Sequence, residues 1–235
     1  GGYAGKIGIV LNPVTPRPAR NTEEDRLAAD RGADMGSRMF LDPLYNGKYT
    51  ERFLETYPEA TMPIQSGDME IISSKTDYLG INYYAEHPAM YDPNEKQEYR
   101  FEPSWQNHTE MGWPVVPEGL FRQLQWIHKR YPVQEFYITE NGAAFADTLS
   151  KDGLKCNDPQ RIDYYREHIK SVKKAIESGI PVKGYFAWSL MDNFEWAYGY
   201  TKRFGLVYID YINQRRIPKD SFYFYRDVIS GSIEL

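Results

Sequence analysis

Cysteine is almost absent from this chain. Cys156 is the single cysteine among 235 residues, so no disulfide can form within the chain. It stands in a polar segment with no His or second Cys nearby, a setting that does not indicate metal or nucleophilic chemistry. We therefore expect an ordinary thiol at this position.

Long apolar runs are absent as well. No stretch approaches the roughly 18 apolar residues that a membrane-spanning helix needs, and the opening residues GGYAGKIGIV lack the layout of a secretory signal. A cytoplasmic location is the expectation. The first residue is not Met and a strand-like segment begins almost at once, so we also expect the chain to be a fragment of a longer polypeptide.

There is no excess of positive charge. The 28 Lys and Arg residues against 33 Asp and Glu residues leave a net charge of −5, which argues against a nucleic-acid or anionic-membrane partner. Aromatic residues, in contrast, make up 15% of the chain, with 20 Tyr and 5 Trp. Rings that carry polar groups are favoured where sugars are bound, and 41% hydrophobic residues are enough for a substantial core.

Four segments have the β-branched, aromatic and apolar composition of buried strands. They are residues 6–12, 77–84, 135–141 and 182–193. Five helical patterns alternate with them, at residues 23–39, 49–57, 118–130, 158–178 and 219–229. Strands separated by helix-bearing crossovers predict an α/β fold with parallel strands and helices on the outside.

Two architectures fit this alternation, a doubly wound sheet and a (β/α)8 TIM barrel. No Gly-rich nucleotide-binding fingerprint follows any of the predicted strands, which weakens the first. Polar residues at strand ends, under long loops, are typical of the catalytic face of a barrel. Four strands are half of what a closed barrel needs, so we expect residues 1–235 to form half of a single TIM-barrel catalytic domain.

The segment FYITENGAAF, residues 136–145, places an acid at the end of a predicted strand. The residues before Glu140 are aromatic or β-branched and suit a strand. Two interpretations are open on local grounds. Asn141-Gly142 is a strong hairpin signal, which would make Glu140 a surface acid entering a turn; alternatively, Glu140 is a carboxylate presented at the mouth of the barrel.

The last strand and its loop, residues 187–211, surround one isolated acid, Glu195, with aromatic residues. Carboxylates accept hydrogen bonds from vicinal sugar hydroxyls, and rings cover the apolar face of a pyranose. Glu195 and Trp196 together therefore suit sugar binding. The alternative is an aromatic core layer with an acid at its margin. We expect Asp192 and Asn193 to brace the loop by side-chain hydrogen bonds.

Four blocks, in their order and spacing, give the chain a specific resemblance. They are GKIGIVLNP, DYLGINYY, YITENG and the run from WSLMDNFEW to RFGLVYIDY. Over essentially its whole length the chain resembles the C-terminal half of the β-glucosidase family, glycoside hydrolase family 1. The resemblance implies a TIM barrel of which this chain supplies roughly strands 5 to 8 and their helices, and it makes the hairpin interpretation of Glu140 the poorer one.

The resemblance also implies roles for residues at the reacting centre. Glu140 corresponds to the nucleophile of a retaining glycosidase, and Tyr84 corresponds to the tyrosine that hydrogen-bonds it. Asn82 resembles a family residue near the same site; otherwise it is a strand-end amide that satisfies loop backbone.

Further residues correspond to the sugar subsites. Trp188, Glu195 and Trp196 match the glycone subsite, and Phe204 matches an aromatic residue beside it. Trp113 matches an aromatic platform on the aglycone side, unless Trp113-Pro114 only staples its loop. The negative charge of Glu195 would repel a phosphate, which disfavours a 6-phospho-β-glycosidase.

The implied function is hydrolysis of β-linked glucosides or galactosides by double displacement. This mechanism needs two carboxyl groups about 5 to 5.5 Å apart. The family's acid/base lies in a T-x-N-E-P motif, and Asn-Glu-Pro occurs nowhere in this sequence. We therefore expect the chain alone to be inactive and to need a partner, either a complementary N-terminal half-barrel or a second copy. The alternative from another class is a non-catalytic carbohydrate-binding or engineered half-barrel scaffold.

No cofactor or metal is predicted, because acid–base glycoside chemistry requires neither. His87, His108, His128 and His168 lie far apart in the sequence and lack the spacing of metal ligands. His128 and His168 fall in helical patterns that predict surface positions. We assign these histidines no chemistry.

Overall fold

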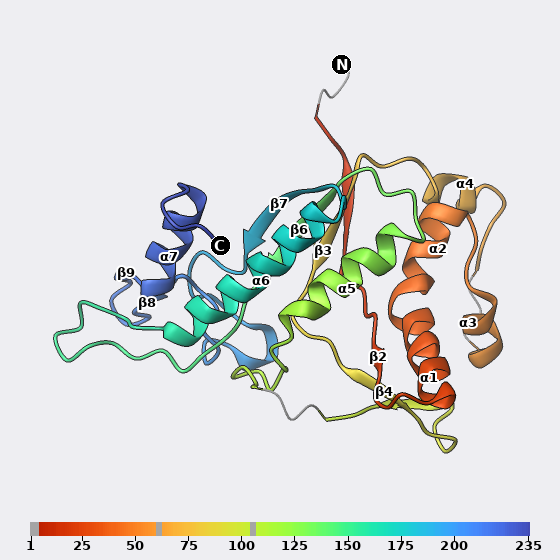
Figure 1. Cartoon of the computed structure of the whole chain (residues 1–235), viewed down its shortest axis with the longest axis horizontal. Coiled ribbons are helices and arrows are strands. Elements are labelled where there is room, and N and C mark those ends of the chain that lie inside the picture. Colours follow the sequence, from red (N-terminus) through yellow and green to blue (C-terminus); the bar gives the residue numbers. More distant parts are fainter. Residues whose placement is uncertain (1–4, 60–62, 104–106) are drawn as a thin grey trace. The chain divides into compact units, whose positions relative to one another are not determined.

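The computed structural model describes residues 5–59, 63–103 and 107–235 (Figure 1). The chain divides into two compact units. The first consists of Gly1–Ile81, Glu86–Trp105 and Arg122–Phe136, and the second of Asn82–Ala85, Gln106–Phe121 and Tyr137–Leu235. The single domain predicted over residues 1–235 stays a prediction.

The strands of the first unit belong to two different sheets. Strand β1 (Gly8–Leu11) pairs in parallel with β3 (Tyr78–Asn82), as the alternation of strands and helices predicts. The N–H of Leu79 on β3 donates to the C=O of Glu135, just before β6 (Phe136–Asn141). A small second sheet has the order β2-β4-β5, with bounds Arg17–Pro18, Pro88–Tyr91 and Tyr99–Phe101.

A long helical run belongs to the same unit. Helices α1 (Glu23–Ala33) and α2 (Met39–Asn46) are joined by a π-helical turn, η1 (Asp34–Arg38), so the run passes residue 39, where the sequence predicts its end (Figure 1, orange). It begins after Thr22, whose hydroxyl accepts the N–H of Asp25 and caps the helix. Two short helices follow, α3 (Glu51–Thr56) and α4 (Asp68–Ile72).

The second unit contains the carboxyl ends of β3 and β6 together with β7 (Val182–Ala187). The N–H of Tyr83 donates to the C=O of Glu140, and the N–H of Trp188 donates to the C=O of Asn141, each over 2.9 Å. The neighbouring strands therefore follow the order β3-β6-β7. Beyond β7 come the 3-10 turn η2 (Trp196–Tyr198), the antiparallel pair β8 (Val207–Ile209) and β9 (Arg216–Pro218), and helix α7 (Asp220–Ile229).

Helix α6 (Pro159–Glu177) packs against β7 and α7 in this unit (Figure 1). Proline stands in its first turn, where no intrahelical N–H bond is lost, and Gly179, with φ of 84°, follows its end. Tyr164 and Tyr165 on its buried face form a hydrophobic cluster with residues of the loops and of α7. Helix α5 (Pro117–His128) begins in the second unit and ends in the first.

The four predicted strands and the predicted helices are present, with shorter strands than the sequence suggests. The last predicted strand stops at Ala187 instead of residue 193. The sequence missed β2, β4, β5, β8, β9 and α4, which have two to five residues each and therefore carry too little periodic pattern. In the described ranges, none of the helices combines the length and apolar character that crossing a bilayer requires.

Candidate active site

All eight candidate residues, Glu140 among them, belong to the second unit. Glu140 is half-buried and occupies the penultimate position of β6, so its carboxylate stands at the carboxyl end of the strand. Two residues earlier, Ile138 is fully buried and anchors the same face of the strand. A rigid strand thus fixes the backbone of the acid while part of its side chain stays accessible.

Tyr84 contacts this carboxylate directly. Its hydroxyl donates a hydrogen bond of 2.6 Å to Oε2 of Glu140. Burial of the phenol, and then this bond, raise the pKa of Tyr84 far above its usual value, so the hydroxyl keeps its proton and remains a donor. A donor fixed on one carboxylate oxygen restricts the orientation of Glu140.

The ring of Tyr84 forms a wall of three rings with those of Trp113 and Phe204. The ring of Tyr84 lies 5.2 Å from that of Trp113 and 6.2 Å from that of Phe204, and Trp113 and Phe204 are themselves 6.2 Å apart between centroids. Phe204 is buried, whereas Trp113 is half-buried. The C=O of Trp113 also accepts the N–H of Thr109, so this residue closes its own loop as well as reaching the wall.

Glu195 brings a second carboxylate to the site. Partial burial, and then the negative charge of Glu140, raise the pKa of Glu195 above its usual value. The charge of Glu140 is therefore close enough to act on the carboxyl group of Glu195. Trp196 follows with a φ of 42° and its side chain 81% exposed, which contradicts an aromatic core layer at this point of the loop.

The side chain of Asn82 lies one strand away from Glu140. Its Oδ1 accepts the hydroxyl of Thr139 over 2.8 Å. Thr139 precedes Glu140 on β6, so the bond joins the ends of β3 and β6 beside the acid. The amide thus satisfies a side chain instead of the loop backbone that the sequence left open as its alternative.

The hairpin interpretation of Asn141-Gly142 is wrong. Neither residue has positive φ, and Asn141 is the last residue of β6. Glycine is required at 142 for a different reason, because a Cβ atom there would lie 1.7 Å from the carbonyl oxygen of Trp188. This close approach brings Trp188, at the end of β7, against the end of β6.

Asn141 is a residue whose importance the sequence did not reveal. It is fully buried, and its Nδ2 donates to the C=O of Tyr83 over 2.7 Å and to the hydroxyl of Tyr164 over 3.0 Å. Its Oδ1 accepts the hydroxyl of Tyr185 over 2.5 Å. One amide therefore ties β3, α6 and β7 to the residue next to Glu140. No local pattern indicates these contacts, because Tyr83, Tyr164 and Tyr185 all lie more than twenty residues from Asn141 in the sequence.

His168 and Cys156, to which the sequence assigns no chemistry, are both buried. His168 is not on the surface: it is fully buried, its ring stacks on Tyr164 at 3.9 Å between centroids, and burial lowers its pKa to about 4. The helical pattern predicts a surface position because histidine is polar. In the structure the ring is buried by packing against other aromatic rings. Cys156 is buried as well, which raises the pKa of its thiol to about 11 and is typical of an unreactive thiol.

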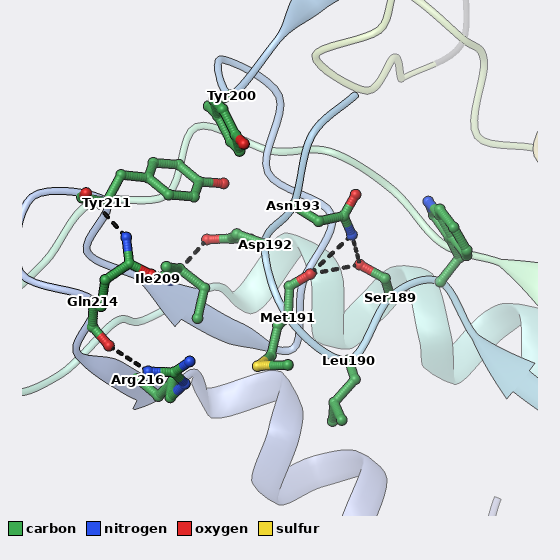
Figure 2. Close-up of a pocket in the computed structure, with 11 residues that line it drawn as sticks. Ser189, Leu190, Met191, Asp192, Asn193, Tyr200, Ile209, Tyr211, Gln214 and Arg216 are labelled. Carbon is green, nitrogen blue, oxygen red and sulfur yellow. Dashed lines mark hydrogen bonds between the residues drawn. The ribbon is translucent and has the colours of Figure 1, made fainter. Parts of the chain in front are cut away.

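A hollow of about 610 Å³ lies along the loop after β7 (Figure 2). Of the eight candidate residues its lining contains Trp188, together with Asn193, Tyr200 and Tyr211. In Figure 2 the side chains of Leu190 and Met191 point away from that of Asn193. Asn193 donates to Ser189 Oγ and to the C=O of Met191, at 2.9 and 3.0 Å, which confirms the expected bracing of the loop. Glu140 is not part of this hollow.

The family model described as glycosyl hydrolase family 1 matches residues 2–232. The chain belongs to glycosyl hydrolase family 1. The resemblance of its four sequence blocks is thereby confirmed.

The relatives carry the names of β-glucosidases and of a glucan glucohydrolase. The chain is 48% identical over 229 residues to a 1,4-β-D-glucan glucohydrolase of Thermotoga neapolitana, and 45% identical to β-glucosidase A of Thermotoga maritima. Each alignment covers 97% of this chain and 51% of the relative. The chain thus spans about half the length of the curated relatives it matches.

Solved family 1 structures have the same fold over that half. The β-glucosidase of Thermotoga maritima matches with a TM-score of 0.92, covering 98% of this chain and 52% of that enzyme. A β-glucosidase of Exiguobacterium antarcticum, 34% identical, also gives 0.92, with 97% and 52% covered. These enzymes are (β/α)8 barrels, so the fold of this family 1 chain is about half of a TIM barrel, as predicted.

Proposed function

We propose that this chain is the nucleophile-bearing half of a retaining β-glycosidase of the β-glucosidase type. The observation that carries the proposal is the hydrogen bond of 2.6 Å from Tyr84 to Glu140, at the end of a strand and beside a wall of rings. The substrates would be β-linked glucosides or galactosides. The names of the relatives support this class.

The proposed reaction is a double displacement at the anomeric carbon. Glu140 attacks this carbon and forms a covalent glycosyl ester, while the bond to the leaving oxygen breaks and that oxygen takes a proton from a second carboxylic acid. Water, deprotonated by the same second group, then attacks the anomeric carbon and releases Glu140. Tyr84 would hold the carboxylate in its attacking orientation during both steps.

Binding of the sugar is assigned to the residues around this pair. Glu195, with Trp188 and Trp196, would hold the glycone hydroxyls and cover the ring face, with Asn82 and Phe204 beside them. Trp113, whose ring contacts those of Tyr84 and Phe204, would face the aglycone. The negative charge of Glu195 supports unphosphorylated sugars over 6-phospho-glycosides.

The second carboxyl group is assigned to a complementary half of the barrel. Each unit bears an apolar surface at a strand that supports such a partner. In the second unit, Phe186 is 56% and Leu190 58% exposed, beside a hollow of about 490 Å³ between β7 and α7. In the first, Ile7 and Val10 of the β1 segment are exposed, and Ile9 lines a hollow with residues of α2. Exposed strand edges with apolar surroundings promote aggregation, and a partner that covers them prevents it.

Hydrolysis of a nitrophenyl β-glucoside tests the proposal. The chain would be assayed alone, and again alone at high concentration to favour pairing with a second copy. It would also be assayed together with a separately made N-terminal half of a family 1 enzyme. Turnover only with the N-terminal half is the expected result. Binding of glucoside without turnover in every mixture would instead favour the carbohydrate-binding scaffold.

A fluoro-sugar trap assigns the nucleophile. In the active mixture the label is expected on the peptide that contains Glu140, and Glu140→Gln should abolish labelling. A label on another acid would overturn the role of Glu140.

A further inference from the structure

Six buried or partly buried charges of the second unit form one continuous set, which we call the charge network. Its members are Asp147, Asp158, Arg161, Asp192, Arg203 and Lys219. Three negative and three positive charges balance. The side chains of Arg161, Asp192 and Lys219 are completely buried, and none of the six is among the residues assigned to sugar binding or to the reaction.

Stability alone does not explain such a set. Removing charges from water is costly, and replacing a buried ion pair by apolar groups of similar volume is often neutral or stabilising. What a hydrogen-bonded set of this kind does provide is a unique arrangement of the segments that carry it.

One end of the charge network holds the segment around Phe204. Asp192 accepts Arg203 Nη1 at 2.6 Å and the main-chain N–H of Gly205 at 2.9 Å. A Cβ atom on Gly205 would lie 2.1 Å from the main-chain nitrogen of Asp192. Both chain neighbours of Phe204 are thus bound to one carboxylate, and the ring of Phe204 contacts that of Tyr84.

The other end holds the segment that follows Glu140. Arg161 donates to the C=O of Ala143 at 3.3 Å and to both oxygens of Asp147, at 2.9 and 2.8 Å. It also donates to Asp158 and to the C=O of Arg203, at 2.5 and 2.8 Å. All five N–H groups of the guanidinium have acceptors, so this side chain has one permitted position.

Lys219 joins the two ends. Its ammonium donates to Asp147 at 2.5 Å and to Asp192 at 2.8 Å. Asp147 lies in the loop after β6 and Asp192 in the loop after β7. Lys219 precedes α7, whose Ser221 donates its N–H and its hydroxyl to Asp158, so the beginning of this helix is fastened to the same set.

We propose that Lys219 and Arg161 are positioning residues of the active site: through the charge network they hold Phe204, and with it Tyr84, against the segment that follows Glu140. The consequence for turnover rests on the proposed function. The consequence for the segments themselves does not, because it concerns only how firmly residues 203–207 and 143–147 are held.

Amide hydrogen exchange of the 235-residue chain tests the proposal without substrate. The variant combines Asp147→Asn with Lys219→Met, which removes one charge of each sign. Exchange should become about tenfold faster at residues 203–207 and 143–147 while the interior of α6 is unchanged, since local opening is separate from global unfolding. The matched control combines Glu118→Gln with Lys174→Met, an exposed ion pair of the same unit, and should change neither segment.

A purely structural role gives a different result, in which every slow amide of the unit accelerates together, and that outcome overturns the proposal. Unchanged exchange in the two segments overturns it as well. If the double variant does not fold, Arg203→Gln, at the more exposed rim of the charge network, is measured in the same way and should loosen residues 203–207.

Activity gives a second and separate measurement. In the mixture that hydrolyses nitrophenyl glucoside, the double variant should lose about tenfold in kcat with a smaller rise in KM, because Tyr84 orients the attacking carboxylate whereas Phe204 only lies beside the sugar. Absence of turnover in the parent mixture would count against the proposed function and leave the exchange result standing.

Discussion

The carbonyl oxygen of Trp188 occupies the space that a side chain at position 142 would need, 1.7 Å from the site of its Cβ atom. The ends of β6 and β7 meet at this point, directly after Glu140. Because the obstacle is main chain and not a movable side chain, Gly142→Ala must displace one of the two strands.

We expect Gly142→Ala to cost roughly 1–3 kcal/mol or more of unfolding free energy, the range for overpacking, as measured by urea denaturation. Gly112→Ala is the control. Gly112 has a φ of 74° and open space around it, so its replacement should cost only the strain of a left-handed backbone, about 1–2 kcal/mol, and less than the change at position 142. Equal losses in the two variants would contradict the steric argument.

Tyr84→Phe removes the hydroxyl that orients Glu140 and keeps the ring in contact with Trp113 and Phe204. In a mixture that turns over glucosides, kcat should fall about 10²-fold, comparable to the loss of one positioned catalytic donor. Thermal stability should change little, and the fluoro-sugar trap should still label Glu140, more slowly. A variant with parental kcat would show that the hydrogen bond has no part in the reaction.

The ionised carboxylate of Glu195 should lower the free energy of unfolding at neutral pH. Its folded-state pKa is raised by burial and by the charge of Glu140, so the folded chain favours the protonated form. Below the pKa of Glu195 in the unfolded chain, this group does not lower the free energy of unfolding. The free energy of unfolding then falls as pH rises through the folded-state pKa of Glu195. Glu195→Gln should therefore raise the urea midpoint at pH 7, leave it unchanged at pH 3, and weaken glucoside binding. A lower midpoint at pH 7 would contradict the assignment.

His168 gives the opposite pH dependence. Burial lowers its pKa from 6.5 to about 4, so the unfolded chain binds the proton first as pH falls. Stability is then lost between pH 6.5 and about 4, by up to about 3 kcal/mol. His168→Gln should flatten the stability profile in this window. His128→Gln, at an exposed position of α5, is the control and should leave the profile as it is.

Charges placed on the surface at β7 should prevent completion of the barrel. Phe186 and Leu190 are exposed there, and Phe186→Lys with Leu190→Lys would put two charges where an apolar partner is proposed. The affinity for the N-terminal half, measured by analytical ultracentrifugation, should fall at least about tenfold, since buried unpaired charge is costly. Secondary structure of the chain alone should not change. Parental affinity would place the contact elsewhere.

The sequence predicted the strands and helices that have a strong period, and it predicted the position of Glu140 relative to β6. It also identified Tyr84 as the partner of Glu140, through the resemblance of DYLGINYY. These elements are long or carry specific motifs. The small sheet β2-β4-β5 and the pair β8 and β9 have two to four residues per strand, and such strands form through tertiary contacts that a local pattern does not contain.

Other features depended on packing between distant segments. Asn141-Gly142 looks like a hairpin signal locally. In the structure, the Asn141 amide accepts a hydrogen bond from Tyr185, and Gly142 leaves room for the carbonyl oxygen of Trp188. Both partners lie more than forty residues further along the chain. His168 lies on a pattern that predicts exposure, but a ring can be buried by stacking on another ring. In the same way the charge network joins residues from Asp147 to Lys219, and no local spacing indicates that they meet.

The exposure of Trp196 has a consequence for the fluorescence of the chain. This indole is 81% exposed, so its fluorescence in the free chain should resemble that of tryptophan in water. Among the described tryptophans, Trp113, Trp126 and Trp188 are half-buried, and their emission should lie at shorter wavelength. A red-edge component that shifts and resists iodide quenching when a ligand is added would thus report contact at residue 196 without any chromogenic substrate.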